Sequence, residues 1–283
     1  MDDTRYPTSL GTSDAEAITL LGKDLAGELM GQTSLGELAF WLVSLRRPAP
    51  GELRLFEAVL VALADHGFSP SAIAARLTYF SAPDSVQGAV AAGLLGGGSR
   101  FLGVTEDTAR FLAAALATQP GPLPTDQLGW DRLATQALTR HREARRGPVP
   151  GLGHPIHKNE DPRTPVLLRI AREEGHYGPH LELFTAIGRV SAQILRRRLP
   201  LNGAGAGGAA LADLGLPLDL LRGFSLLART AGLLGHLAEE RRTPIANQVY
   251  LSVDRSARYV VPDAQGTQPE PGTTGPPPPT DLS

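Results

Sequence analysis

The spacing of apolar residues is the feature that most limits what this chain can fold into. Alanine and leucine recur every three to four residues along most of it, which is the period of a helix face. The period-two alternation of half-buried strands is scarce, and aromatic residues, which favour strands, make up only 5%. We therefore predict an all-α, multi-helical fold.

Local signals place two of these helices around a corner. A helix is predicted over residues 52–65, and Gly67 just beyond it suits a helix C-terminus. Ser69 and Pro70 are residues preferred at the start of a helix, so a second helix should begin there. Its expected inner face consists of Ile73, Ala74 and Leu77. His66 is therefore expected in the corner between the two helices.

Charge and composition exclude several classes of protein. The chain carries 27 Lys and Arg against 29 Asp and Glu, a net charge of −2, which argues against nucleic-acid binding. The absence of cysteine excludes disulfide scaffolds and cysteine nucleophiles. The first residues are acidic and no apolar run is long enough to span a bilayer, so we predict no membrane partner and a cytoplasmic location. The Pro/Gly-rich tail over 263–283 is predicted to be disordered.

The stretch GLGHPIHKNEDPR, residues 151–163, brings two imidazoles and a guanidinium close together just before a predicted helix. Exposed amides at a helix N-terminus and a nearby cation favour an anionic ligand. The alternative is a solvated loop in which Asp161 only caps the helix. His154 and His157 alone do not make a convincing metal site, because no further ligands lie at helix spacing, so no metal is predicted.

This stretch closely resembles the G-[FY]-G-H-x-[VI]-x-K-x-x-D-P-R signature of the citrate synthase superfamily. Two further segments agree in order with that family, Asp65-His66-Gly67 and the helix ARTAGLLGH over 228–236. The opening of the chain is similar to the short bacterial citryl-CoA lyase branch. The resemblance implies a homodimer and an all-α fold with two subdomains around a cleft. We assign 1–104 with 223–262 to the large one and 105–222 to the small one.

The resemblance also implies roles for individual residues. His154 would polarise the oxaloacetate carbonyl, Arg163 and Arg229 would clamp substrate carboxylates, and His66 would be a further contact. The residues alone also admit structural roles, with His66 capping a helix end and Arg229 in an internal ion pair. His236 is expected to be a packed core histidine.

Two departures from the family pattern affect the chemistry. The loop over 97–103 lacks the histidine that stabilises the enol of acetyl-CoA in synthases, and it is similar instead to a loop of ATP-citrate lyase. Arg100 is assigned as the replacement catalytic donor. The family's catalytic aspartate in N-V-D corresponds to Ala204 in Asn202-Gly203-Ala204. Asp213, the next carboxylate along the chain, is expected to face elsewhere.

The same resemblance implies CoA or acetyl-CoA as a co-substrate, with no covalently bound cofactor. We assign CoA contacts to Arg145, Arg146, Gly151 and Gly153. Two functions remain open. One is an acyltransferase or lyase that makes or cleaves the bond between acetyl-CoA and oxaloacetate. The other is a degenerate paralogue, or a partner subunit, that binds a small carboxylic acid or acyl-CoA without turnover.

Overall fold

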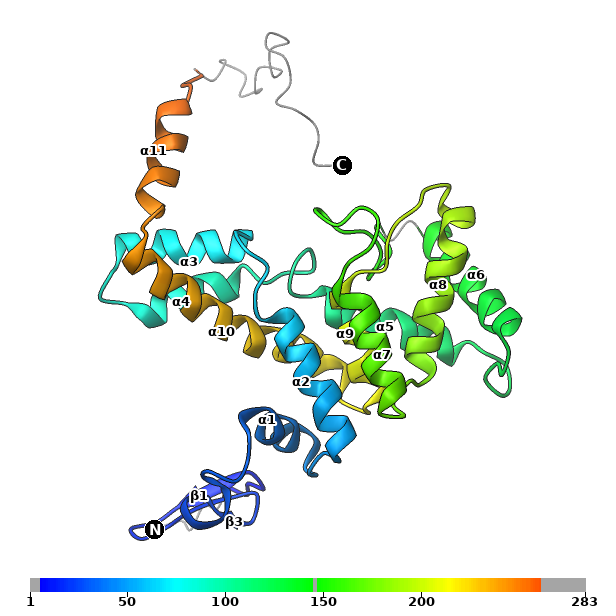
Figure 1. The fold of residues 1–283 in the computed structure, drawn as a ribbon, viewed down its shortest axis with the longest axis horizontal. Coiled ribbons are helices and arrows are strands. Elements are labelled where there is room, and N and C mark those ends of the chain that lie inside the picture. The colour runs from blue at the N-terminus through cyan, green and yellow to red at the C-terminus, as the bar shows by residue number, and fades with distance from the viewer. Residues whose placement is uncertain (1–5, 145–146, 261–283) are drawn as a thin grey trace.

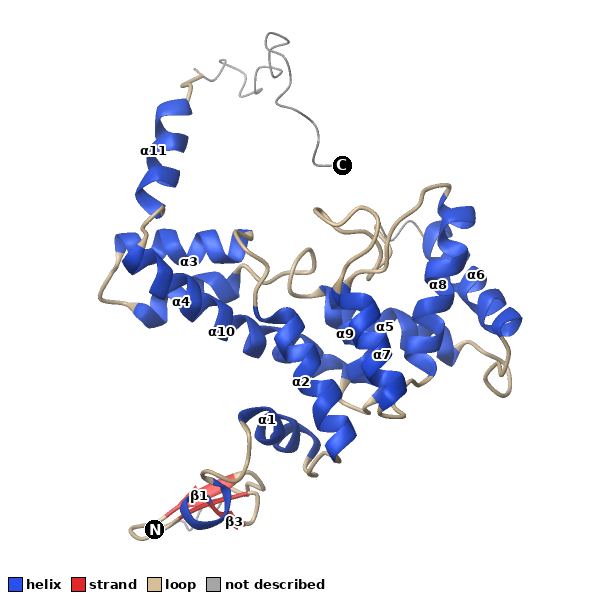
Figure 2. Ribbon diagram, viewed as in Figure 1, coloured by secondary structure: helices blue, strands red, loops and turns tan. Residues whose placement is uncertain are grey.

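Helices dominate the computed structural model, which describes residues 6–144 and 147–260 (Figures 1 and 2). The α-helices of this part of the chain are α1 (Leu35–Ser44), α2 (Pro50–Ala64), α3 (Pro70–Ser81), α4 (Val86–Leu95), α5 (Val104–Ala117), α6 (Gln127–Glu143), α7 (Arg163–Glu173), α8 (Pro179–Leu195), α9 (Gly203–Asp213), α10 (Leu221–Arg242) and α11 (Ala246–Ser256). The prediction of a multi-helical fold is confirmed. Arg145, Arg146 and the tail over 263–283 lie outside the described residues.

A small antiparallel sheet near the N-terminus is the one departure from helix that the sequence pattern did not predict (Figure 2). It consists of β1 (Gly11–Ser13), β2 (Ile18–Leu20) and β3 (Lys23–Asp24), in the order β1-β2-β3. A short π-helical turn, η1 (Leu25–Leu29), follows it. Strands of two or three residues are too short to show a period of two, so the pattern could not reveal them.

The corner between α2 and α3 forms as predicted. The Ser69 hydroxyl accepts a hydrogen bond from the Ala72 amide, and Pro70 is the first residue of α3. The predicted inner face of α3 was wrong, however, because Ile73, Ala74 and Leu77 are only half-buried. The buried face is Ala72, Ala75 and Arg76. Hydrophobicity cannot reveal this face, since Arg76 is buried in an ion pair with Glu240.

The main core joins α1, α2 and α5–α10, with η2 (Leu218–Leu220) packed at its edge. At one end of this core the ring of Phe56 packs edge-to-face against Phe40 and Phe224, with ring centroids 5.4 and 5.0 Å apart. A second cluster of Ala75, Ala89, Leu233 and Leu237 joins α3, α4 and α10. The main core draws on both predicted subdomains, and their boundaries at 104/105 and 222/223 stay a prediction.

The long helix α10 runs from the middle of the molecule to α3 and α4, and α11 projects away from its end (Figure 1). Helix α10 packs against α2, α3, α4 and α5, whereas α11 packs chiefly against α3. Within the described part of the chain, no helix combines the length and the apolar character needed to cross a membrane.

Candidate functional site

Three histidines from two distant segments meet in one place. His66 follows the end of α2, while His154 and His157 lie in the loop that leads into α7. The Nε2 atoms of His66 and His157 are 3.2 Å apart. The His154 ring stacks on His157, with centroids 4.5 Å apart, and lies 4.9 Å from the His66 ring. All three side chains are half-buried. We call these residues the histidine cluster.

The loop that carries His154 is fixed by its neighbours on both sides. Gly151 and Gly153 have φ of 81°, a left-handed conformation that glycine adopts without strain. The Gly153 amide donates to the Pro200 carbonyl at 2.8 Å. The side-chain amide of Asn202 donates to the Gly153 carbonyl, also at 2.8 Å, and the Asn202 backbone amide donates to Gly151. The loop is therefore tied to the start of α9.

Backbone contacts set the protonation of His154. Its Nδ1 accepts hydrogen bonds from the amides of Ile156 and His157, at 3.1 and 3.0 Å. The neutral ring must then carry its proton on Nε2. Burial, followed by the nearby His66, lowers the pKa of His154 to about 4. At neutral pH His154 is therefore an uncharged ring that presents an N–H.

Arg163 is held by the buried carboxylate of Asp161. Its Nε and Nη2 donate to Asp161 at 3.0 and 2.8 Å, and Nη1 donates to the Ala62 carbonyl at 3.1 Å. Asp161 also accepts from the Gly203 amide at 2.7 Å. Although burial opposes it, hydrogen bonding to Arg163 and Gly203 holds the pKa of Asp161 far below its usual range. Asp161 is thus a permanent anion that orients Arg163.

Arg229 offers buried donors that no described residue satisfies. Its side chain is 7% exposed and lies 3.6 Å from Asp65, yet Nε and Nη1 make no hydrogen bond within the described residues. Burial lowers the pKa of Arg229, and the charge of Arg163 acts in the same direction. Burial lowers the pKa of His66, and the positive charge of Arg163 is the second largest cause of this shift. Arg163 contacts the Ala62 carbonyl and Arg229 lies beside Asp65, so both guanidinium groups lie at the end of α2, next to His66.

A chain of polar contacts runs from Asp65, the ion-pair neighbour of Arg229, through the buried side chains of His236, Arg76 and Glu240. His236 is not a merely packed core histidine, because its Nε2 lies 2.9 Å from Asp65 and its Nδ1 accepts from Arg76 at 3.2 Å. Arginine can only donate, so His236 must donate to Asp65 through Nε2. Arg76 pairs with Glu240 at 2.9 Å, and Glu240 accepts from the amides at the start of α11. The contacts run from Asp65 to α11.

No hydrogen bond, ion pair or ring contact joins Arg100, Ala204 or Asp213 to the histidine cluster within the described residues. Arg100 is exposed in the glycine-rich loop after α4, and no hydrogen bond or ion pair joins it to a described residue. Ala204, near the start of α9, presents only a methyl group that packs on the core. Asp213 faces elsewhere, as predicted, since it accepts from the amides of Gly178, His180 and Leu181 at the start of α8.

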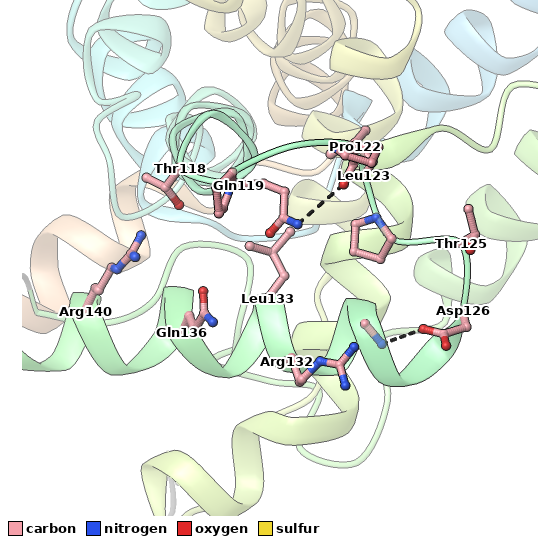
Figure 3. A pocket seen from close by; sticks show the side chains of 13 residues that line it. Thr118, Gln119, Pro122, Leu123, Thr125, Asp126, Arg132, Leu133, Gln136 and Arg140 are labelled. Carbon is pink, nitrogen blue, oxygen red and sulfur yellow. Dashed lines mark hydrogen bonds between the residues drawn. The ribbon is translucent and has the colours of Figure 1, made fainter.

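A separate hollow of about 740 Å³ lies between the end of α5 and α6 (Figure 3). Its walls include Gln119, Arg132, Gln136 and Arg140, with prolines from the connecting loop. None of the histidine cluster and neither Arg163 nor Arg229 lines it. We therefore place the candidate site at the histidine cluster and not at this hollow.

Sequence reasoning missed three contributors to the site. His157 was noted in the motif but its contact with His66, 91 residues away, has no local signal. Asp161 was interpreted as a capping acid, whereas it also fixes the Arg163 side chain. Asp65 belongs to the segment Asp65-His66-Gly67, but the sequence predicts no role for its side chain. The adjacency of Asp161 to Pro162-Arg163 was the one available signal for the buried pair.

Comparison with known proteins identifies the family and the fold of this chain. The family model described as "Citrate synthase, C-terminal domain" matches residues 23–249. The solved structure of citryl-CoA lyase from Hydrogenobacter thermophilus is similar, with a TM-score of 0.77 and 29% identity, over 93% of this chain and 96% of that one. ATP citrate lyase from Methanothrix soehngenii, solved in complex with citrate and coenzyme A, has a TM-score of 0.74 and 22% identity, over 95% and 44%.

A curated relative from the same group of proteins is also similar in sequence, over a smaller share of its own length. The "Probable ATP-citrate synthase" of Dictyostelium discoideum is 24% identical over 258 residues, which is 84% of this chain and 39% of that protein. The chain therefore spans about two fifths of the length of this curated relative.

Proposed function

Because this chain belongs to the citrate synthase family, we propose that it makes or cleaves the carbon–carbon bond between acetyl-CoA and oxaloacetate. The solved structures to which this chain is similar are enzymes, and one of them was solved with citrate and coenzyme A. We assign the chain to the citryl-CoA lyase or citrate synthase type, with CoA or acetyl-CoA as co-substrate and no covalently bound cofactor. We also propose that it is a homodimer, a state that light scattering can test.

The buried donors of Arg229 are the observation that carries this proposal. A guanidinium whose buried Nε and Nη1 make no hydrogen bond within the described residues, in a site that also holds Arg163, fits a substrate with two carboxylates. The N–H of neutral His154 adds a donor suited to a carbonyl or hydroxyl oxygen. Oxaloacetate and the citryl group of citryl-CoA carry these groups together.

The reaction can be followed through these residues. In the condensing direction the methyl carbon of acetyl-CoA loses a proton and bonds to the carbonyl carbon of oxaloacetate. The carbonyl electron pair moves onto oxygen, where the His154 N–H stabilises the developing negative charge. Cleavage follows the reverse course. Arg163 and Arg229 hold the carboxylates so that the carbonyl faces His154.

Proton transfer at the acetyl carbon is the weak step. The methyl group of Ala204 cannot accept a proton, and Asp161 is already committed to Arg163 and Gly203. The loss of a positioned base typically costs about 10²- to 10⁴-fold in rate. Slow turnover is therefore expected, and Ala204 favours the second candidate, a paralogue or partner subunit that binds the carboxylic acid or acyl-CoA without turnover.

CoA recognition is assigned to the loop around Gly151 and Gly153 and to Arg145 and Arg146. The Gly153 amide already donates to Pro200, so it is not available to the thioester or phosphates. Gly151 places the loop through its left-handed conformation and close packing on Phe184, where an added Cβ would come within 2.8 Å. Its contribution to CoA binding is therefore proposed to be the shape of the loop. Arg145 and Arg146 stay predicted contacts.

The test is an assay of citryl-CoA cleavage and acetyl-CoA condensation on the wild type, His154→Ala and Ala204→Asp. We expect slow wild-type turnover, a loss of about 3–4 kcal/mol in transition-state stabilisation in His154→Ala, and faster turnover in Ala204→Asp. His141→Ala, which removes a half-buried imidazole on α6 that contacts Phe111 and no residue of the histidine cluster, is the control and should retain the wild-type rate.

Three other outcomes would change the assignment. Fast wild-type turnover that Ala204→Asp leaves unaltered would mean that another base operates. Oxaloacetate binding by calorimetry without turnover in any variant would establish the binding-only candidate. If neither oxaloacetate nor acetyl-CoA binds, alone or together, both candidates fail.

A further inference from the structure

The histidine cluster contains one imidazole more than the proposed chemistry uses. His154 polarises the substrate and His66 supplies a contact, but His157 has no part in that scheme. Its Nε2 nevertheless lies 3.2 Å from that of His66, and one ring nitrogen from each of the three histidines falls within 4.8 Å of the others. We propose that His66, His154 and His157 form a binding site for a transition-metal dication of the zinc class.

The spacing of the nitrogens suits such an ion. Zinc binds imidazole nitrogen at about 2.0–2.1 Å in tetrahedral geometry, which separates two ligand nitrogens by about 3.3 Å. The Nε2 atoms of His66 and His157 are already at that separation. Three protein imidazoles with a fourth, open position is a known arrangement for zinc, and imidazole also suits copper, nickel and cobalt.

His154 is the ligand that must adjust. Its Nδ1 accepts from two backbone amides, and its protonated Nε2 cannot coordinate without a change of tautomer or ring orientation. The turn that supplies these amides is open to water, since Ile156 is 63% exposed, so solvent can replace the bonds that the ring gives up. His66 and His157 should therefore contribute more to metal affinity than His154 does.

The surrounding charges permit a dication. Two guanidinium groups, Arg163 and Arg229, lie beside the cluster, but each has a carboxylate neighbour in Asp161 and Asp65. Each guanidinium charge is therefore offset by a neighbouring carboxylate, which weakens its repulsion of the ion. The loop that carries His154 and His157 is also tied to α9 through Asn202, which holds the loop backbone in place, so that only the His154 ring has to adjust.

A metal at this position would regulate the proposed reaction. The ion and oxaloacetate would both need His66 and His154, so zinc should inhibit by competing with the carboxylic acid. This competition rests on the proposed function, whereas metal binding itself does not. The two can therefore fail separately.

The experiment titrates the metal-free full chain, prepared with a chelator, with Zn²⁺ by calorimetry. We expect saturation at one ion per chain, and a Co²⁺ titration should give the visible absorption of a tetrahedral site. His157→Phe should lower Zn²⁺ affinity at least about 100-fold, beyond the effect of losing an outer contact. His66→Asn should do the same, and the control His141→Phe should bind like the wild type.

The failing outcomes are distinct. Absence of saturable Zn²⁺ binding, or Zn²⁺ binding that both His157→Phe and His66→Asn leave unchanged while thermal melts show them folded, would overturn the site. Oxaloacetate is then titrated with and without one equivalent of Zn²⁺. Zn²⁺ binding without any oxaloacetate binding would refute the proposed function and leave the metal site standing. Binding of both ligands at once with undiminished affinity would refute the inhibition.

Discussion

Replacing Asp161 by asparagine keeps the size of the side chain and removes the charge that orients Arg163. The carboxylate is fully buried and receives bonds from the Arg163 side chain and from the Gly203 amide. Removing one partner of a buried ion pair costs about 3–5 kcal/mol. The Arg163 side chain is 20% exposed, so water screens part of this loss, and we expect the free energy of unfolding to fall by about 2–4 kcal/mol.

Urea unfolding of the wild type and Asp161→Asn at pH 7 measures this change, and calorimetry with oxaloacetate measures the site. Asp131→Asn is the matched control, because Asp131 pairs with Arg189 at 2.7 Å on the surface, where such pairs contribute about 0–1 kcal/mol. Oxaloacetate should bind Asp161→Asn at least about tenfold more weakly, since Arg163 loses its orientation.

The pH dependence gives this prediction a second readout. The folded pKa of Asp161 lies below its unfolded value near 3.9, so its contribution is present above that value and is lost as the pH falls through the folded pKa. The difference between wild type and Asp161→Asn should persist at about pH 5 and shrink in stronger acid. An unfolding free energy equal to that of Asp131→Asn, with unaltered oxaloacetate affinity, would refute the reasoning.

Two further predictions test the site from other directions. In Gly203→Ala the added Cβ would meet Arg163 Nε at 2.6 Å, so calorimetry should show weaker oxaloacetate binding, while Gly235→Ala, with open space around it, should only stabilise α10. Because the folded pKa of His154 is about 4, below its unfolded value near 6.5, the unfolded chain binds more protons between these values. Urea midpoints should therefore rise with pH over this window, and a smaller slope in His154→Asn would confirm the assignment; an equal slope would contradict it.

The fold was largely predictable because the spacing of apolar residues and the residues at helix ends indicate helices locally. The start of α3 at Ser69 and Pro70 needs only neighbouring residues, and the structure confirms it. The inner face of α3 was not predictable in the same way. Arg76 is buried because Glu240, 164 residues away, neutralises it, and no local pattern contains that information. The resemblance to the citrate synthase family is confirmed by the matching family model.

The site was predictable where its residues adjoin in sequence. Arg163 and His154 belong to one motif, and the fold brings the His154 ring within 4.9 Å of His66 and the Arg163 side chain to the end of α2. The contact between His157 and His66 depends on how the end of α2 meets the loop before α7, which only the packed structure reveals. The protonation of His154 likewise follows from two backbone amides whose direction the sequence does not give.

The row of polar contacts from Asp65 to Glu240 has a consequence for α11, the last described helix. Glu240 holds the first amides of α11 with one oxygen and Arg76 with the other, while Arg76 sets the orientation of His236. The contacts that orient His236 and those that anchor the last described helix therefore form one connected network. A change at Glu240 would alter both the anchoring of α11 and the charge that faces Arg76.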